Sequence, residues 1–291
     1  MITKAIIPIA GLGTRFLPLS KVLPKEFFPL ADKPLLQYII EEAKAAGVTD
    51  FIFVVNSNKK IVQDYLKRSL KLEKILEERK QDKLLEELRS AEKVLQDISA
   101  SFVTVPAPLG DGHAVLQARK LVGEDPCFIF FPDDIMECQV PASVQLAKVY
   151  NTAQKPIVGL CKVPQEKTVQ YGIIDGEKLA SRLYKVKKSI EKPATPELAP
   201  SNLAMVGRRI ITPDVFDYIK KTKPNKKGEI ILAEVIEEMV KDGKMVYGYE
   251  IEGKWWECGN KASWMKSFVH FALNNDKFGK EMKSFIKEEK I

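Results

Sequence analysis

A glycine-rich loop near the N-terminus has the residues to hold a phosphate group. The run Gly11–Pro18 (GLGTRFLP) begins where an apolar stretch of the chain stops. Because Gly11 and Gly13 carry no Cβ atom, the backbone can turn sharply here and direct its N–H groups at an anion. Arg15 and Lys25 add two positive charges over the same place. The loop therefore has the composition of a phosphate-binding site.

Two common phosphate-binding motifs do not match this loop. No Gly-Lys-Ser/Thr sequence closes it, so it is not a Walker A loop. The third glycine of the dinucleotide fingerprint would stand at position 16, which is Phe16. A glycine loop with Arg and Lys at this spacing indicates a nucleoside triphosphate bound in another way. The alternative is a plain strand-to-helix turn with two surface cations.

A pair of acidic residues follows the strand that we predict at Cys127–Phe131. A carboxylate at the carboxyl end of a strand is a natural ligand for Mg²⁺, which takes one or two carboxylates together with phosphate oxygens. Successive residues of an extended chain point to opposite faces. We therefore expect Asp133, and not the adjacent Asp134, to bind the metal. An ordinary acid in a strand-end turn is the alternative.

These motifs and several others, in order along nearly the whole chain, resemble the sugar-nucleotide pyrophosphorylases. Among these the chain is most similar to the bacterial UTP–glucose-1-phosphate uridylyltransferases. The segments on which the resemblance depends are Gly11–Phe16, Pro24–Glu26, Asp32–Tyr38, Pro108–Ala114, Pro132–Asp133, Tyr171–Gly172, Ile190–Pro193, Ala199–Arg208 and Trp256–Gly259.

The resemblance implies a nucleotidyl transfer that depends on Mg²⁺. An oxygen of glucose-1-phosphate would attack the α-phosphorus of UTP in line, giving UDP-glucose and pyrophosphate. No covalent intermediate is needed, so catalysis would consist of positioning and charge neutralisation. The same chemistry on dTTP or another sugar-1-phosphate is an alternative. A weakly active or non-catalytic paralogue that binds sugar nucleotide is another.

The resemblance also implies roles for individual residues. Arg15 would hold the leaving pyrophosphate, Lys25 would neutralise the α-phosphate, and Lys192 would bind the sugar phosphate. With Asp133 these form the expected catalytic set. The expected nucleotide-binding residues are Ala10, Gly11, Leu12, Gly13, Thr14, Glu26 and Gly112. The expected sugar-binding residues are Tyr171, Gly172, Glu191, Asn202 and Val206.

Glu257 is the expected second metal ligand. The family usually has Asp at this position of a Tyr-Asp-x-Gly element, whereas this chain has Trp-Glu-Cys-Gly. Glutamate is one methylene longer and can still reach a metal ion. The alternative is a packing acid beside Trp255 and Trp256.

The chain departs from the family pattern at two further places, the first of which concerns the base. Val105 stands where the family usually has a glutamine that binds the uracil edge. The element at 228–234 ends in Ile-Leu-Ala-Glu, where Gln-Leu-Thr-Asp is usual. Backbone N–H groups near Gly112, at a predicted helix start, would then have to recognise the base. His113 is expected to be structural, because the reaction needs no general base.

The elements that must position these residues follow an alternating pattern. Apolar runs alternate with segments of helical period, which indicates an α/β fold with a doubly wound, mostly parallel, Rossmann-like sheet. By resemblance it is the glycosyltransferase-A-like nucleotidyltransferase fold. Ligands bind such sheets at the carboxyl ends of the strands, where the glycine loop and Asp133 both lie. The predicted strands are 5–10, 51–55, 102–105, 127–131, 156–163, 171–175, 203–211 and 245–251.

The remaining segments read as helices attached to one domain. Helices are predicted near 36–43, 112–121 and 228–240. Residues 59–99 form a charged helical insertion and about 260–290 form two C-terminal helices. We find no internal boundary, so the expected organisation is a single nucleotidyltransferase domain over 1–291.

The composition of the chain indicates which binding partners and which cellular compartment to expect. The chain has 291 residues, 45% of them apolar, and a net charge of +7. Its lysines are dispersed and not interleaved with aromatic residues, which favours anionic substrates and no nucleic acid. No stretch reaches ~18 apolar residues, no signal-peptide layout is present, and four cysteines are scattered. We expect a cytoplasmic homo-oligomer, dimer or tetramer, with no membrane partner.

Overall fold

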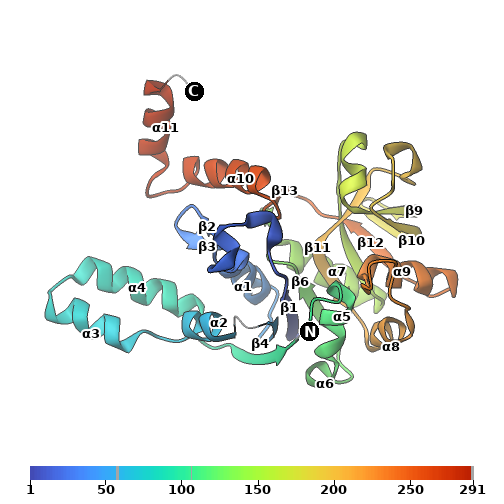
Figure 1. Ribbon diagram of the computed structural model, residues 1–291, viewed down its shortest axis with the longest axis horizontal. Coiled ribbons are helices and arrows are strands. Elements are labelled where there is room, and N and C mark those ends of the chain that lie inside the picture. The colour runs from blue at the N-terminus through green and yellow to red at the C-terminus, as the bar shows by residue number, and fades with distance from the viewer. Residues whose placement is uncertain (57–58, 106, 290–291) are drawn as a thin grey trace.

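A mixed β-sheet with helices on both faces forms the centre of the structure (Figure 1). The computed structural model describes residues 1–56, 59–105 and 107–289. In the first half of the sheet, neighbouring strands are parallel, as the alternating pattern predicts. Their spatial order is β5 (Ser99–Thr104), β4 (Asp50–Val55), β1 (Lys4–Ile9) and β6 (Cys127–Phe130).

The second half of the sheet is not mostly parallel, and that part of the prediction is wrong. The strand β11 (Leu203–Ile211) is antiparallel to β6 and pairs with both β8 (Ile157–Lys162) and β9 (Gly172–Ala180). β12 (Tyr247–Glu250) pairs with β8, and β10 (Leu183–Glu191) pairs with β12 and β9. These strands therefore close into a ring, because β9 returns to β11 at the end of the series.

The alternation of apolar residues in β1 explains why the sheet is covered on both faces. Ile6 packs into one apolar cluster, while Ala5, Ile7 and Ile9 pack into the other. Helices α5 (Asp111–Gln117), α6 (Arg119–Val122), α8 (Pro213–Lys221) and α9 (Leu232–Lys241) cover the Ile6 side. Helices α1 (Leu35–Ala45), α2 (Lys59–Leu66), α7 (Ala142–Ala153) and α10 (Lys261–Leu273) contribute to the other.

The predicted helical insertion and C-terminal helices are both present. α3 (Leu70–Glu78) and α4 (Asp82–Val94) project from the body as a hairpin, and α10 leads into α11 (Gly279–Glu288), which extends away (Figure 1). Position 290 of the predicted C-terminal segment lies outside the described residues. Within those residues, no helix combines the length and apolar character needed to cross a membrane.

Short elements complete the fold near the strand ends. β7 (Asp134–Glu137) pairs with β13 (Lys254–Glu257) in an antiparallel ribbon, and β2 (Pro29–Leu30) pairs with β3 (Lys33–Pro34). The sequence prediction missed β7, β10, β13, α7 and α8. The 3₁₀ turns are η1 (Thr14–Phe16), η2 (Leu19–Lys21), η3 (Lys25–Phe27), η4 (Gln165–Gln170) and η5 (Pro196–Leu198).

Candidate functional site

Two adjoining cavities lie beyond the carboxyl ends of β1 and β6. The first, of about 390 Å³, is lined by the glycine loop together with Lys25 and Val105, and we call it the glycine-loop cavity. The second, of about 190 Å³, is lined by Arg15 and Lys192 among others, and we call it the Lys192 cavity. Both are lined by Asp111, Phe131 and Asp133. These three shared residues form a common wall, so the two cavities are neighbours.

The glycine loop is shaped by a single left-handed residue. Gly13 has a φ of 63°, a conformation that L side chains rarely adopt, and it begins the η1 turn. The loop residues Ala10 to Thr14 all line the glycine-loop cavity. The η3 turn, after Pro24, adds Lys25 and Glu26 to the same wall. With Asp133, eight of the site residues predicted from the sequence thus meet in one cavity.

A charged triplet occupies the boundary between the cavities. Lys25 Nζ contacts Asp133 Oδ2 at 2.5 Å. Burial alone would lower the pKa of Lys25, but the Asp133 and Glu26 carboxylates outweigh it and raise this pKa. Burial likewise opposes ionisation of Asp133, yet Lys25 holds the pKa of that carboxyl below its usual value. Glu26 is buried, and burial raises its pKa to about 7. At neutral pH this arrangement presents an ammonium–carboxylate pair to a ligand.

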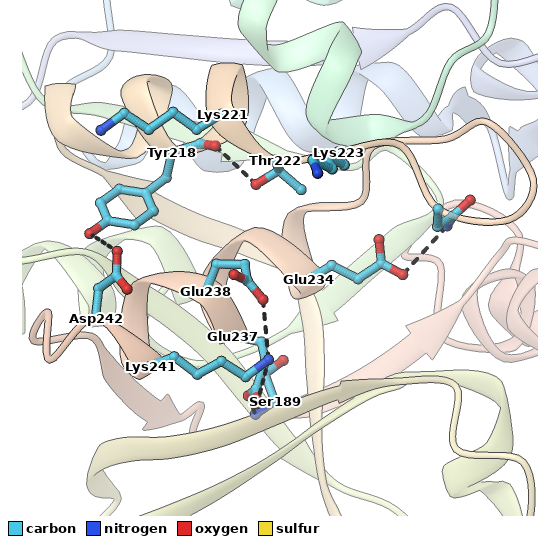
Figure 2. Close-up of a pocket in the computed structure, with 11 residues that line it drawn as sticks. Ser189, Tyr218, Lys221, Thr222, Lys223, Glu234, Glu237, Glu238, Lys241 and Asp242 are labelled. Carbon is cyan, nitrogen blue, oxygen red and sulfur yellow. Dashed lines mark hydrogen bonds and ion pairs between the residues drawn. The ribbon is translucent and has the colours of Figure 1, made fainter.

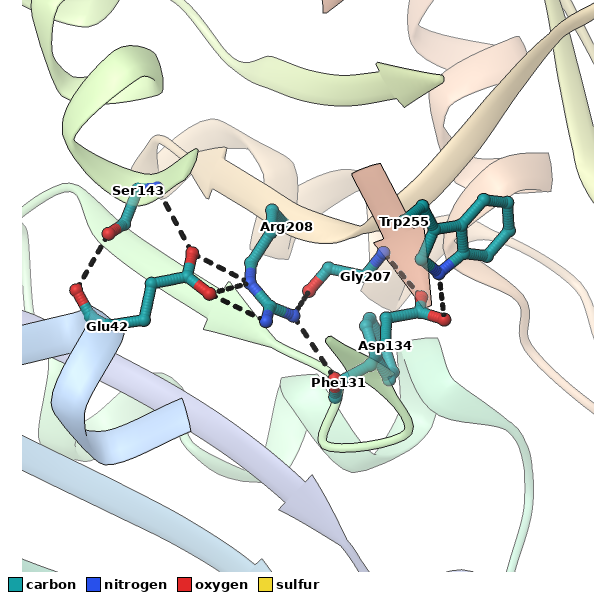
Figure 3. A network of polar contacts seen from close by, with 7 residues as sticks. All are labelled: Glu42, Phe131, Asp134, Ser143, Gly207, Arg208 and Trp255. Carbon is teal, nitrogen blue, oxygen red and sulfur yellow. Dashed lines mark hydrogen bonds and ion pairs between the residues drawn. The ribbon is translucent and has the colours of Figure 1, made fainter. Parts of the chain in front are cut away.

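Asp134 also lines the Lys192 cavity, but its carboxylate is engaged by groups other than those that contact Asp133. Its two carboxylate oxygens accept hydrogen bonds from Trp255 Nε1 at 2.8 Å and Gly207 N at 2.7 Å (Figure 3). Burial and the neighbouring Asp133 charge raise the pKa of Asp134 to about 7. Asp134 therefore fixes the turn that bears Asp133.

A buried ion pair supports the same turn from beneath. Arg208 is 1% exposed, and its Nε and Nη2 donate to the Glu42 carboxylate at 2.8–3.0 Å (Figure 3). Its Nη1 donates to the carbonyl oxygens of Phe131 at 3.2 Å and Gly207 at 3.1 Å. Ser143 N donates to Glu42 at 3.1 Å. The network connects α1, α7 and β11 to the chain just before Asp133.

Glu257 reaches the site through the β7–β13 ribbon. Its carboxylate accepts hydrogen bonds from Tyr171 Oη at 3.0 Å, Ser263 Oγ at 3.1 Å and Asn260 Nδ2 at 3.3 Å. A Cβ atom built on Gly259 would lie 3.2 Å from Asp133 Oδ2 and 3.7 Å from Glu257 Oε1. The two carboxylates therefore converge on one small space, although three donors already contact Glu257.

The Lys192 cavity contains most of the predicted sugar-binding residues. Tyr171, Gly172, Glu191 and Val206 line it, and Lys192 Nζ contacts Glu191 Oε1 at 2.8 Å. A Cβ atom on Gly172 would lie 2.6 Å from Met205 Cε and 3.0 Å from Glu191 Oε2, so a larger residue here would displace the ends of these side chains. The predicted Asn202 does not belong to this group: it is exposed and does not line the cavity. It immediately precedes the first residue of β11.

Gly112 does not offer a free donor to a base. Its N–H donates to Ile230 O at 2.9 Å, and Gly112 is not among the residues that line the glycine-loop cavity. Val105 and His113 do line that cavity. The Nε2 atom of His113 lies 3.1 Å from Gln117 Nε2, while its Nδ1 has no hydrogen-bond partner among the described residues.

Sequence reasoning missed two charged residues of the site, Asp111 and Arg209. Asp111 lines both cavities and Arg209 lines the Lys192 cavity. Asp111 stands inside the motif Pro108–Ala114, and Arg209 directly follows the motif Ala199–Arg208. Their place in or beside these motifs was the available signal, but a charged residue in a sequence does not by itself identify its contacts.

A larger cavity, of about 560 Å³, lies elsewhere, between α8, α9 and β10 (Figure 2). None of the predicted site residues lines it. Its charged groups pair with one another: Lys241 Nζ contacts Glu238 at 3.1 Å, and Tyr218 Oη donates to Asp242 at 2.9 Å. Size alone therefore does not identify the reactive site of this chain.

Comparison with known proteins identifies relatives along the whole chain. The Nucleotidyl transferase family matches residues 4–272. A protein of Staphylococcus haemolyticus named UTP--glucose-1-phosphate uridylyltransferase is 41% identical, over 99% of this chain and 98% of its own length. A protein of Staphylococcus saprophyticus named UTP--glucose-1-phosphate uridylyltransferase 1 is 40% identical, over 98% of both chains.

Solved structures agree with these relatives. A UTP-bound UGPase from Acinetobacter baumannii has a TM-score of 0.90 at 34% identity and covers 99% of both chains. A UDP-glucose pyrophosphorylase complexed with UDP-glucose has a TM-score of 0.86 at 34% identity, covering 94% of this chain and all of its own.

Proposed function

Since the chain belongs to the nucleotidyl transferase family, we propose that it makes UDP-glucose and pyrophosphate from UTP and glucose-1-phosphate. The chain is a uridylyltransferase in the pattern of the relatives described above, which match it over nearly their whole length. The observation that supports this most is the pair of cavities that share Asp133, because two anionic substrates need adjoining pockets with one charge-balancing centre.

The reaction follows from the groups around this centre. An oxygen of the sugar phosphate attacks the α-phosphorus, and the bond from that phosphorus to the bridging oxygen of pyrophosphate breaks. Lys25 donates to the α-phosphate and offsets the charge that develops there. Arg15 holds the leaving pyrophosphate, for which its planar guanidinium is suited. Lys192 holds the attacking phosphate beside Glu191, which accepts from sugar hydroxyls.

A divalent metal ion belongs to this proposal, and Mg²⁺ is the ion we propose. The convergence of Asp133 and Glu257 beside Gly259 fits such an ion, since Mg²⁺ binds through one or two carboxylates together with phosphate oxygens. When bound, the ion would neutralise phosphate charge during the displacement. Asp133 is the better ligand of the two, because three hydrogen-bond donors already contact the Glu257 carboxylate.

Several other features remain proposals. A single domain, a homo-oligomer (dimer or tetramer) and a cytoplasmic location are all consistent with the fold described. The free thiols of Cys127, Cys138, Cys161 and Cys258 fit a reducing compartment. The uracil base would lie in the glycine-loop cavity against Val105 and the backbone at 107–110, because the N–H of Gly112 is already used.

Release of pyrophosphate tests the proposal directly. The purified protein is assayed with Mg²⁺, with each of UTP, dTTP, CTP, ATP and GTP, and with the 1-phosphates of glucose, galactose and mannose. We expect the highest kcat/KM with UTP and glucose-1-phosphate. Faster turnover of another pair would assign another substrate. No turnover with any pair, together with tight binding of UDP-glucose, would indicate a non-catalytic binding protein.

A further inference from the structure

Arg209 is a buried cation whose hydrogen-bond donors are not used. The residue is 8% exposed, and among the described residues neither its Nε nor its Nη1 has a hydrogen-bond partner. Its neighbour Arg208 is also buried, but donates to a carboxylate and two carbonyl oxygens. The donors of a buried guanidinium with a purely structural role normally have hydrogen-bond partners, as those of Arg208 do. The free donors of Arg209 therefore require another explanation.

Asp111 faces Arg209 without closing a hydrogen bond to it. The separation between Arg209 Nη1 and Asp111 Oδ2 is 3.7 Å, which is too long for a direct bond. The other oxygen, Asp111 Oδ1, accepts from Leu232 N at 2.9 Å and Gly112 N at 2.8 Å. One carboxylate oxygen and two guanidinium N–H groups are thus left side by side. A gap of this kind is bridged when a small polar group donates to one side and accepts from the other.

This pair lies on the wall of the Lys192 cavity. Asp111 and Arg209 both line it, as does a second acid–base pair, Glu191 and Lys192. The guanidinium carbon of Arg209 lies 5.1 Å from the centre of the Phe131 ring, so the ring holds it in place on one face. The donors are accordingly rigid, and a rigid donor–acceptor pair can distinguish one substituent from another.

We infer that Arg209 and Asp111 form a subsite for one hydroxyl of the sugar ring: Arg209 donates to the hydroxyl oxygen, and that hydroxyl donates to Asp111 Oδ2. The inference rests on the proposed function, since it assigns the sugar phosphate to the Lys192 cavity. It adds a specificity-determining pair to that cavity. The group that binds here is a neutral polyhydroxylated ring, because the charges of Arg209 and Asp111 already balance each other.

The test compares wild type with Arg209→Met on a series of substrates. Pyrophosphate release is measured with UTP and with glucose-1-phosphate or its 2-, 3-, 4- and 6-deoxy analogues. Arg119→Met is the matched control: Arg119 also lies over a phenylalanine ring, with its carbon 5.4 Å from the Phe216 ring centre, but it lines neither cavity. Arg209→Lys is the second variant, which keeps the charge if the methionine variant does not fold.

In wild type, one deoxy position should lower kcat/KM by about tenfold or more, because the analogue leaves buried polar groups unpaired. In Arg209→Met, the kcat/KM of that same analogue should differ from that of glucose-1-phosphate by less than about threefold. The change should be in KM more than in kcat, and the losses caused by the other deoxy positions should remain. Arg119→Met should keep every wild-type penalty. Arg209→Lys should reduce the selected penalty, since ammonium geometry differs from guanidinium geometry.

The inference and the proposed function fail in different ways. If wild type shows no turnover of glucose-1-phosphate, the proposed function fails. If wild type turns it over and the Arg209 variants lower kcat/KM for all analogues by the same factor, Arg209 is structural and the inference is wrong. If wild type were more active on a sugar phosphate that carries a carboxylate than on glucose-1-phosphate, the inference would also be wrong.

Discussion

Removal of the Glu42 carboxylate should destabilise the protein strongly, because it leaves the Arg208 charge without a partner. In Glu42→Leu, the guanidinium, which is 1% exposed, loses its contacts to both carboxylate oxygens. It keeps only the carbonyl oxygens of Phe131 and Gly207. Breaking a buried pair from one side typically costs about 3–5 kcal/mol. At roughly 2 °C per kcal/mol for a chain of this length, the Tm should fall by roughly 6–10 °C.

A double-mutant cycle separates the pair from the burial of each group. Urea unfolding is measured for wild type, Glu42→Leu, Arg208→Met and the double variant. The double variant removes both charges from the interior, so its loss of stability should be clearly smaller than the sum of the two single losses. Ser143 N also loses its acceptor in both variants that lack Glu42. This shared loss adds about 1 kcal/mol to the cost of each of these two variants.

The same variants should lower activity in the molecules that remain folded. Arg208 holds the Phe131 carbonyl, two residues before Asp133, so its loss should loosen the turn that bears this carboxylate. We expect kcat to fall at saturating substrate in Arg208→Met. Two results would refute the reasoning. One is a Glu42→Leu variant within about 1 kcal/mol of wild type, well below the cost of a buried unpaired charge. The other is a double variant that loses the full sum of the single losses.

Five further substitutions test other parts of the site. Asp133→Asn should lower kcat by about a thousandfold with an unchanged circular dichroism spectrum, since a charge at the phosphates is lost; near wild-type turnover at saturating metal would refute it. By calorimetry, Lys25→Ala should weaken UTP binding and Lys192→Ala should weaken UDP-glucose binding, and the reverse pattern would exchange their roles. Val105→Gln should raise the kcat/KM ratio of UTP to dTTP, unless wild type already prefers UTP by several orders of magnitude. Burial raises the pKa of Glu26 to about 7, so stability present below its ordinary pKa is lost as pH rises through about 7. Glu26→Gln should therefore gain Tm relative to wild type between about pH 4.5 and 7 and show a level difference above that, and a difference that is constant over the whole range would contradict this.

The first half of the fold was predictable because its strands are buried on both faces. Such strands are continuous apolar runs, and β4 and β6 are recognisable as such in the sequence. The glycine loop and Asp133 could then be placed together, because the carboxyl ends of parallel strands meet at one edge. The structure places both in the glycine-loop cavity.

The second half depends on pairings that no local pattern specifies. β10 (LYKVKKSIE) alternates apolar and charged residues only in part, and a strand of this kind is defined by its partners β9 and β12. The ring closes through β9 and β11, whose paired residues Leu203 and Ile174 are far apart in the sequence. The Glu257 contacts have the same origin, since they depend on the pairing of β13 with β7.

The segment before α9 shows that the departures from the family pattern do not amount to decay of the site. Ile230 exchanges backbone hydrogen bonds with the motif around Gly110, donating to Leu109 O and accepting from Gly112 N, both at 2.9 Å. A Cβ atom on Gly110 would lie 2.3 Å from Ile230 O, so this contact requires the glycine. The next helix begins at Leu232, whose N–H is bound by Asp111. A site that had lost its function would be free to lose this close fit. Asp111 lines both cavities, so this close fit keeps their shared wall in place and favours retention of catalysis over its loss.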